Sequence, residues 1–302
     1  MHEYVGRFAP SPTGPLHFGS LIAAVASYCD ARANHGLWLV RMEDLDKPRE
    51  MAGAATDILN TLTTFGFKWD GEVMYQSQRT HAYDAAFQRL QTSNQTYACS
   101  CSRKEIADSA TKIGIEGVIY PKTCLNNPLK KNDRHAWRIK TTSEIIRFND
   151  RIQGTIQQNL GDDIGDFVLK RADGLFTYQL AVVVDDAEQH VTHIVRGADL
   201  LNSTTRQIYL QQCLGYPSIQ YTHVPVASNT HGEKLSKQTL AKPLDRNHPS
   251  ESLWLALAFL QQNPPDHFKS ASIKALWEWA ISHWDLSKIK GTTKVITNEK
   301  LV

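Results

Sequence analysis

A stiff turn near the N-terminus constrains the fold of this chain more than any other stretch. Residues 7–20 read Arg-Phe-Ala-Pro-Ser-Pro-Thr-Gly-Pro-Leu-His-Phe-Gly-Ser, and three prolines with Gly14 exclude regular structure there. Residues 3–8 before it predict a short buried strand, and the apolar, alanine-rich residues 21–33 predict a helix. A strand, a rigid turn and a helix start place free N–H groups and a positive dipole end together, which suits a nucleotide phosphate.

Two residues of this turn have the right chemistry for that role. Gly19 lets a ligand approach the backbone, and His17 offers a donor to a phosphate oxygen. A plain strand-to-helix turn with a core-facing histidine fits the pattern equally well, because a strand–glycine–helix turn alone is a weak signal.

The composition describes an ordinary globular protein. The chain has 302 residues, enough for two domains, with 41% hydrophobic and 21% charged residues and a formal net charge of +2. We see no signal peptide and no apolar run near the roughly 18 residues of a membrane span. Five cysteines, odd in number and unevenly spaced, argue against a disulfide framework, so we expect a cytoplasmic protein.

Strand and helix patterns alternate along the chain. Helices are predicted over residues 17–35, 51–65, 80–93 and 203–214, and buried strands over 37–42, 192–197 and 221–226. Such alternation favours an α/β fold, here a doubly wound, Rossmann-type parallel sheet.

Charged residues follow the predicted strands, at the sheet edge where ligands of α/β proteins bind. Glu43, after residues 37–42, can accept a hydrogen bond from an amine, and Arg196, at the end of another strand, can hold a carboxylate bidentately. The alternative for Glu43, Asp44 and Asp46 is surface pairing with the neighbouring basic residues Arg41, Lys47 and Arg49.

Three cysteines, Cys99, Cys101 and Cys124, fall within 26 residues and favour a zinc site over unconnected thiols. A tetrahedral zinc needs a fourth ligand, and spacing leaves several candidates open: Tyr120, Glu105, Asp108, Glu116 and His135. The lone Cys29 and Cys213 are expected to be small core residues.

The next segment is basic. Residues 136–140 and 145–148 predict antiparallel strands in a stretch where lysine and arginine outnumber acidic residues. Such strands can lie along a phosphate backbone, and a solvated charged face is an equally good interpretation.

Four motifs follow one another along the chain, and their joint occurrence is more informative than any one of them alone. They are Pro-Ser-Pro-Thr-Gly-x-Leu-His-x-Gly, Arg-x-Glu-Asp-x-Asp, Arg-Gly-x-Asp-Leu and Lys-Leu-Ser-Lys, spread over roughly residues 4–245. Together they resemble the glutamyl/glutaminyl branch of the class I aminoacyl-tRNA synthetases. Residues 17–20 match the HIGH signature of that class, with Ser20 in place of its second histidine, and residues 234–238 match the KMSKS signature.

The resemblance implies ATP, with Mg²⁺, and L-glutamate as substrates. It assigns catalysis to His17, Gly19, Lys234 and Lys237, and ATP binding to His17, Gly19, Ser20 and Lys237. The glutamate pocket would comprise Arg7, Phe8, Ala9, Pro10, Ser11, Glu43, Tyr178 and Arg196. Arg7 or Arg196 would take a substrate carboxylate and Glu43 the ammonium group.

Only 65 residues follow Lys237, which leaves no room for a large anticodon-binding domain. With its Cys-x-Cys insert, the chain resembles the bacterial glutamyl-queuosine tRNA(Asp) synthetase family, a ligase family that glutamylates queuosine in the anticodon of tRNA(Asp). That family binds one structural zinc through three cysteines and a tyrosine, here Cys99, Cys101, Tyr120 and Cys124.

We therefore expect four segments and a monomer that binds the tRNA(Asp) anticodon stem-loop. Residues 1–96 and 166–228 would form the two halves of the Rossmann domain, 97–165 a zinc-containing insertion, and 229–302 the KMSKS-like loop with a helical C-terminal subdomain. The alternatives are a minimal glutamyl-tRNA synthetase charging the 3′ end of tRNA(Glu), and a non-catalytic RNA-binding relative.

Overall fold

The computed structural model describes residues 4–127, 129, 134–229 and 242–297. Its centre is a set of parallel strands: β1 (Val5–Phe8), β2 (Leu37–Met42), β3 (Met74–Tyr75), β11 (His193–Gly197) and β12 (Gln220–Val224). β1 pairs with β2 and β2 with β3, while β11 pairs with β12. The backbone N–H of Thr192 donates to the carbonyl of Val5 at 2.9 Å, so β11 lies beside β1. The predicted α/β class with parallel strands is confirmed.

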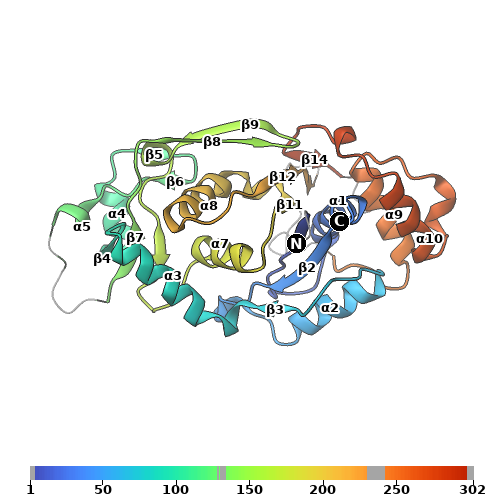
Figure 1. The fold of residues 1–302 in the computed structure, drawn as a ribbon, viewed down its shortest axis with the longest axis horizontal. Helices are drawn as coiled ribbons and strands as arrows, with labels where there is room; N and C mark the ends of the chain where they lie inside the picture. Colours follow the sequence, from blue (N-terminus) through green and yellow to red (C-terminus); the bar gives the residue numbers. More distant parts are fainter. Residues whose placement is uncertain (1–3, 128, 130–133, 230–241, 298–302) are drawn as a thin grey trace.

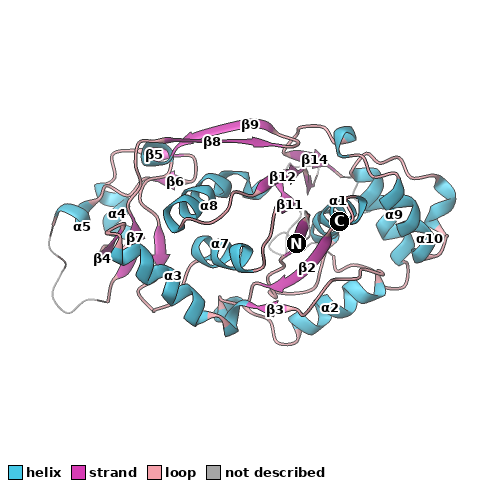
Figure 2. Cartoon of the chain, viewed as in Figure 1, coloured by secondary structure: helices cyan, strands magenta, loops and turns pink. Residues whose placement is uncertain are grey.

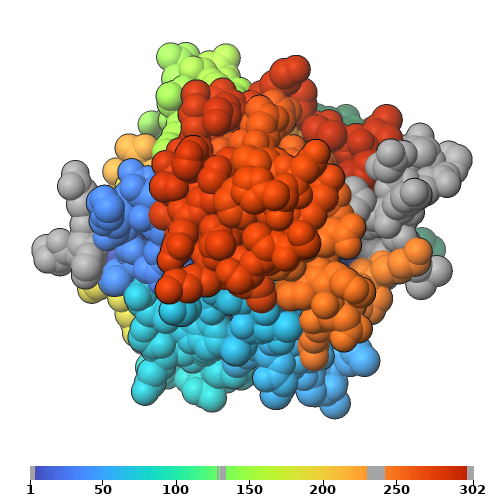
Figure 3. Space-filling view, turned by 90° about the vertical axis from the view of Figure 1, so that its right-hand side faces the viewer, coloured from blue at the N-terminus to red at the C-terminus, as the bar shows by residue number. Residues whose placement is uncertain are grey.

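Helix α1 (Phe18–Ala33) is buried on nearly every side, because it lies between this sheet and the C-terminal helices (Figure 1). Those are α9 (Pro249–Phe259) and α10 (Ile273–Ser282). Trp277 of α10 packs edge-on against Tyr28 of α1 with ring centroids 4.8 Å apart, and its indole N–H donates to the Phe65 carbonyl at 2.9 Å. Figure 3 shows the C-terminal residues forming one continuous surface with the N-terminal ones.

The predicted helices are present; the first three are shorter than predicted, and the last begins two residues earlier, at Leu201. They are α1, α2 (Ala54–Thr64), α3 (Thr80–Thr92) and α8 (Leu201–Leu214). The first helix was predicted to extend to residue 35. It ends at Ala33, because His35 adopts a left-handed conformation with φ of 53°. At Gly36, the next residue, a Cβ would lie 2.5 Å from the Tyr4 carbonyl oxygen, so only glycine fits where the chain passes Tyr4. A further helix, α7 (Tyr178–Glu188), packs with α3 and α8 in a second core.

The insertion contains antiparallel strands (Figure 2). β4 (Thr96–Cys99) and β10 (Val168–Lys170) flank β7 (Ala136–Ile139), so this sheet continues past the expected segment boundary at residue 165. β8 (Ile145–Asp150) pairs with β9 (Gly154–Asn159) in a ribbon that runs back to the parallel strands, where the Arg151 N–H donates to the Tyr221 carbonyl at 3.1 Å. The remaining elements are β5 (Ile113–Gly114), β6 (Gly117–Val118), β13 (Val226–Ser228), β14 (Lys294–Ile296), α4 (Arg103–Ser109), α5 (Thr123–Asn126) and α6 (Leu160–Asp163).

The two predicted basic strands are therefore both antiparallel, but they belong to different sheets. Three basic side chains of this stretch, two from the first strand and Arg151 from the turn after β8, are engaged within the protein. Arg138 donates to the Asp166 carbonyl at 2.8 Å, Lys140 donates to the Asn94 carbonyl at 2.7 Å, and Arg151 pairs with Asp30 at 2.5 Å. These contacts favour a structural role for the three residues over contact with a phosphate backbone.

Within the described ranges, no helix combines the length and the apolar character that crossing a membrane requires.

Candidate active site and cysteine cluster

A cavity of about 670 Å³ opens at the carboxyl ends of β1, β2 and β11. The fold brings ten of the residues proposed from the sequence to its lining: Arg7, Phe8, Ala9, Ser11, His17, Gly19, Ser20, Glu43, Tyr178 and Arg196. Pro10 does not line it, but its carbonyl accepts the Glu43 N–H at 3.0 Å and so ties the stiff turn to the end of β2. Lys234 and Lys237 lie outside the described residues.

The start of α1 forms one end of the cavity. The Ser20 hydroxyl accepts a hydrogen bond from the His17 N–H at 3.1 Å, so the serine that replaces the second histidine of the signature caps the helix. The chain just before this point is held by the C-terminal region, since the Leu244 N–H donates to the Leu16 carbonyl at 3.0 Å. The helix N-terminus is thus fixed in place at the edge of the cavity, in the geometry that suits a phosphate.

The first wall of the cavity, formed where β1 and β2 end, carries compensated charges. Arg7 Nε lies 3.1 Å from Asp186 Oδ1, and Arg41 Nη2 contacts the same oxygen at 2.8 Å. All three side chains are buried. Burial opposes the ionisation of Asp186, but Arg41 and Arg7 outweigh it and lower its pKa.

Glu43 faces the cavity from this wall. Its carboxylate lies 3.6 Å from Arg41 Nη2. Burial raises the pKa of Glu43 to about 7, although Arg41 and Arg7 favour its charged form. A bound ammonium group would add a further positive charge that favours the ionised form of Glu43.

The second wall is built around Arg196, at the end of β11. Its guanidinium donates to four groups: His223 Nε2 at 3.0 Å, Thr204 Oγ1 at 2.9 Å, and the Tyr178 hydroxyl and Leu200 carbonyl at 3.4 Å each. None of these acceptors is a carboxylate. Arg196 is therefore a desolvated cation, 4% exposed, at the surface of a cavity of ligand size.

The acids after β2 do not form the surface pairs that were the alternative, with one exception. Asp46 does pair with Arg49, at 2.6 Å near the surface. Glu43 contacts Arg41 inside the protein, and the buried Asp44 accepts hydrogen bonds from the Ser77 N–H and hydroxyl.

Several residues around the cavity were missed by sequence reasoning. Arg41 was considered only as a surface partner, while Asp186 and His223 were not considered. The signal for Asp186 was available, because two adjacent acids inside an apolar helical run, residues 180–187, predict buried charges that need partners. A histidine within the buried strand at 221–226 carried a similar signal.

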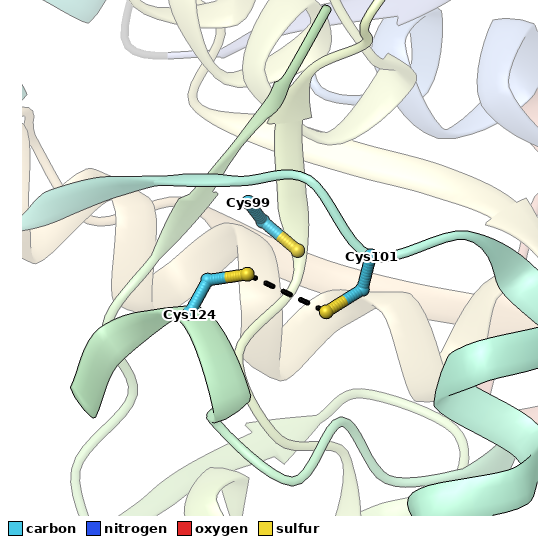
Figure 4. A group of neighbouring side chains, drawn as sticks. All are labelled: Cys99, Cys101 and Cys124. Carbon is cyan, nitrogen blue, oxygen red and sulfur yellow. Dashed lines mark hydrogen bonds between the residues drawn. The ribbon is translucent and has the colours of Figure 1, made fainter. Parts of the chain in front are cut away.

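The cysteine cluster lies apart from the cavity, in the insertion. The sulfur atoms of Cys99, Cys101 and Cys124 point toward one another from β4, the segment after it and α5, and all lie within 4.8 Å (Figure 4). The Tyr120 oxygen is 3.3 Å from Cys99 Sγ and 3.6 Å from Cys101 Sγ. Tetrahedral zinc with Zn–S bonds of about 2.3 Å separates ligand sulfurs by about 3.8 Å, so this arrangement fits the metal.

The other donors that spacing left open are placed elsewhere. Glu105 accepts the Ser102 N–H at the start of α4, Glu116 pairs with Arg206 at 2.6 Å, and the His135 ring packs on Trp137. No aspartate, glutamate or histidine of the described residues joins the three sulfurs. Tyr120 is held in position by the Arg138 guanidinium, 3.9 Å above its ring, and by the Cys124 N–H, which donates to its oxygen at 2.9 Å.

Comparison with known proteins places this architecture in a class. The family model of the class I tRNA synthetases (E and Q), catalytic domain, matches residues 3–260. The fold also resembles the glutamate-tRNA synthetase of Elizabethkingia anophelis, with a TM-score of 0.78 and 23% identity; the match covers 99% of this chain and 68% of that one.

Relatives with higher sequence identity indicate one family within this class. The glutamyl-Q tRNA(Asp) synthetase of Aromatoleum aromaticum is 55% identical over 94% of this chain and 89% of its own length. The protein of the same name from Neisseria meningitidis serogroup A is 54% identical over 95% of this chain and 97% of its own. The chain therefore belongs to the class I tRNA synthetases (E and Q) and, within them, to the family of the glutamyl-Q tRNA(Asp) synthetases.

Proposed function

We propose that this protein uses ATP to activate L-glutamate as glutamyl-adenylate, and then transfers the glutamyl group to the queuosine base at the anticodon wobble position of tRNA(Asp). The observation that carries the proposal is the relatives' shared name at 54–55% identity over nearly the whole chain. The cavity supports it, because an amino acid with two carboxylates and an ammonium group matches its charges.

We assign glutamate binding to residues from both walls of the cavity. Arg196 holds a substrate carboxylate with the guanidinium edge that faces Tyr178 and the cavity, and Glu43 accepts the ammonium group. The remaining proposed residues of the pocket, Arg7, Phe8, Ala9, Pro10 and Ser11, form the wall beside Glu43. Arg7 contributes positive potential, although Asp186 already neutralises part of its charge.

The ATP phosphates lie at the start of α1 in this proposal. His17, Gly19 and Ser20 would approach them, and Mg²⁺ would accompany the nucleotide. A glutamate carboxylate oxygen attacks the α-phosphorus, and the bond from that phosphorus to the pyrophosphate oxygen breaks. Positioning and charge stabilisation catalyse such a displacement, and we assign part of the stabilisation to Lys234 and Lys237.

Zinc would be held by Cys99, Cys101, Cys124 and Tyr120, with a structural function, because four protein ligands leave no open coordination position. We expect one zinc per chain in metal analysis, and loss of that zinc with destabilisation of the insertion in Cys124→Ser. Metal-free protein together with an unchanged unfolding transition in this variant would contradict the assignment.

The RNA partner of the proposed reaction is the anticodon stem-loop of tRNA(Asp). Bases of a single-stranded loop can be splayed out and inserted into a protein cavity, so the active site itself can read the loop. We propose that the insertion, residues 97–165, takes the position of an acceptor-type subdomain beside the cavity. The enzyme would act as a monomer in the cytoplasm, where tRNA and ATP are available.

The decisive experiment offers three RNAs side by side, with ATP, magnesium and labelled glutamate. The RNAs are tRNA(Glu), tRNA(Asp) with queuosine and tRNA(Asp) with unmodified guanine at the same position. We expect label only on the queuosine-bearing tRNA(Asp). Label on tRNA(Glu) would instead indicate a minimal glutamyl-tRNA synthetase, and no label with no pyrophosphate exchange would indicate a binding protein.

A further inference from the structure

We propose that Asp150 and His223 are positioning residues that fix the guanidinium of Arg196 for substrate binding. The inference rests on the proposed function, because it takes Arg196 to hold a carboxylate of glutamate. It assigns a role to the inner end of the β8–β9 ribbon, which reaches from the insertion to the parallel strands (Figure 1).

The backbone places the two side chains together. His223 of β12 lies directly opposite Arg196 of β11 in the parallel ladder, and its side chain is fully buried. Its two ring nitrogens have different partners: Nε2 lies 3.0 Å from Arg196 Nε, and Nδ1 lies 2.7 Å from Asp150 Oδ2. The imidazole therefore connects the end of β8 with the wall of the cavity.

These partners decide the tautomer of the ring. The Nε–H of arginine can only donate, so His223 Nε2 must be the acceptor and the ring proton must reside on Nδ1. Asp150 accepts that proton, while its other oxygen accepts the backbone N–H groups of Ile152 at 3.0 Å and Gln153 at 2.8 Å. The orientation of Asp150 is thus set by the turn that closes the ribbon.

The surroundings keep the ring neutral. Burial and, to a smaller extent, Arg196 lower the pKa of His223 to about 4, because the hydrogen bond to Asp150 only partly opposes them. A protonated ring would direct a second N–H at Arg196 and place two positive charges in contact. One neutral tautomer is the state that leaves an acceptor for Arg196.

The consequence is a guanidinium with one nitrogen, Nη1, directed at the cavity. Nε is engaged by His223, and Nη2 by Thr204 and the Leu200 carbonyl. Nη1 points to the Tyr178 hydroxyl and the cavity. If His223 presented a donor, the guanidinium would turn away from this geometry, and the contact of Nη1 with a substrate carboxylate would be lost.

A matched pair of amide substitutions separates the two contacts of His223. In His223→Gln the amide oxygen can take the place of Nε2 and accept from Arg196, whereas in His223→Asn the amide nitrogen can replace Nδ1 and donate to Asp150 only. We expect His223→Asn to raise the KM for glutamate about 10- to 100-fold in ATP–pyrophosphate exchange with tRNA(Asp) present, because a misplaced group of about 1 Å has effects of this order. The KM for ATP should stay within about twofold, and His223→Gln should restore most of the glutamate KM.

Asp150→Asn tests the tautomer itself. Its amide can donate to Nδ1, which moves the ring proton to Nε2, opposite Arg196; a comparable exchange in a serine protease triad fixes the wrong tautomer. We expect this variant to raise the glutamate KM as His223→Asn does. The ¹⁵N NMR signals of His223 should change from the Nδ1–H to the Nε2–H pattern.

His193→Asn is the control, since His193 lies in β11 as well but its ring stacks on Tyr4 at 4.0 Å. Its glutamate KM should be unchanged. Equal effects of His223→Asn and His223→Gln, or a parallel rise of both KM values with a lower melting temperature, would overturn the inference. If the wild-type protein activates no glutamate, the proposed function is wrong. The role of Asp150 can still be tested in that case, because an unchanged His223 tautomer in Asp150→Asn would overturn the inference without any activity measurement.

Discussion

Arg7 and Arg196 line one cavity, at the carboxyl ends of the neighbouring strands β1 and β11, and are equally buried at 4% exposure. Their partners differ. Arg7 shares the carboxylate of Asp186 with Arg41, whereas the groups that accept from Arg196 among the described residues are all uncharged. Burial alone therefore does not make an arginine a binding residue; the deciding factor is whether the protein already supplies the counter-charge.

The two arrangements have opposite energetic consequences. A buried arginine that is paired and fully hydrogen-bonded is tolerated in the folded state, and loss of its partner is costly. A buried arginine without a carboxylate carries a desolvation cost that a substrate anion can relieve. We therefore expect changes on the Arg7 side to affect mainly stability, and changes on the Arg196 side to affect mainly binding.

The largest effect should come from Asp186→Asn. This substitution leaves Arg7 and Arg41 without their shared carboxylate, and breaking a buried pair in this way costs about 3–5 kcal/mol. Urea unfolding should show this loss in the free energy of unfolding. A loss below about 1 kcal/mol would mean that Asp186 is not the essential counter-charge of this wall.

Arg196→Met should have the opposite effect, a large loss of glutamate binding without a loss of stability. Removing one partner of a buried charge–charge contact costs about 2–5 kcal/mol of binding, so the kcat/KM for glutamate should fall about 30-fold or more. The free energy of unfolding should stay constant or rise, because the replacement removes an uncompensated buried charge. Unfolding at lower urea concentration would show that Arg196 is as structural as Arg7.

Glu43 should make glutamate binding dependent on pH. Its pKa is raised to about 7, so the carboxylate that accepts the ammonium group is present above that pH and lost below it. The KM for glutamate should therefore rise as pH falls through 7, toward a limit of about tenfold per pH unit. Glu43→Gln should bind glutamate weakly with no such dependence, and a flat wild-type KM between pH 8 and pH 6 would exclude this role.

Tyr178→Phe should have the smallest effect. It removes one acceptor of Arg196, at 3.4 Å, and leaves the contacts to His223 and Thr204. A net hydrogen bond contributes about 1 kcal/mol, which corresponds to about a fivefold rise in the glutamate KM. A rise as large as that in Arg196→Met would assign the carboxylate contact to the tyrosine hydroxyl.

Much of the fold followed from local patterns. The strand–turn–helix at residues 5–33, the strand at 37–42 and the helix at 80–92 depend on proline positions and on the spacing of apolar residues, which act over a few residues. The position of Glu43 and Arg196 at the sheet edge was also predicted, because the direction of parallel strands decides where their ends meet. The short spacing of Cys99 and Cys101 likewise pointed to a metal cluster.

Local patterns could not decide which of two arginines remains available to a substrate. The partner of Arg7 lies 179 residues away, on α7, and the partner of His223 lies 73 residues away, at the end of β8. Spacing also left five candidates for the fourth ligand at the cysteine cluster, among which only the folded chain places the Tyr120 oxygen next to the sulfurs. The sequence by itself determined which charged and metal-binding residues are present and which of the charged ones lie at strand ends. Tertiary packing decided the partners of these residues. The reason is that the interaction of buried charges depends on distance in space and on desolvation, neither of which is encoded in neighbouring residues.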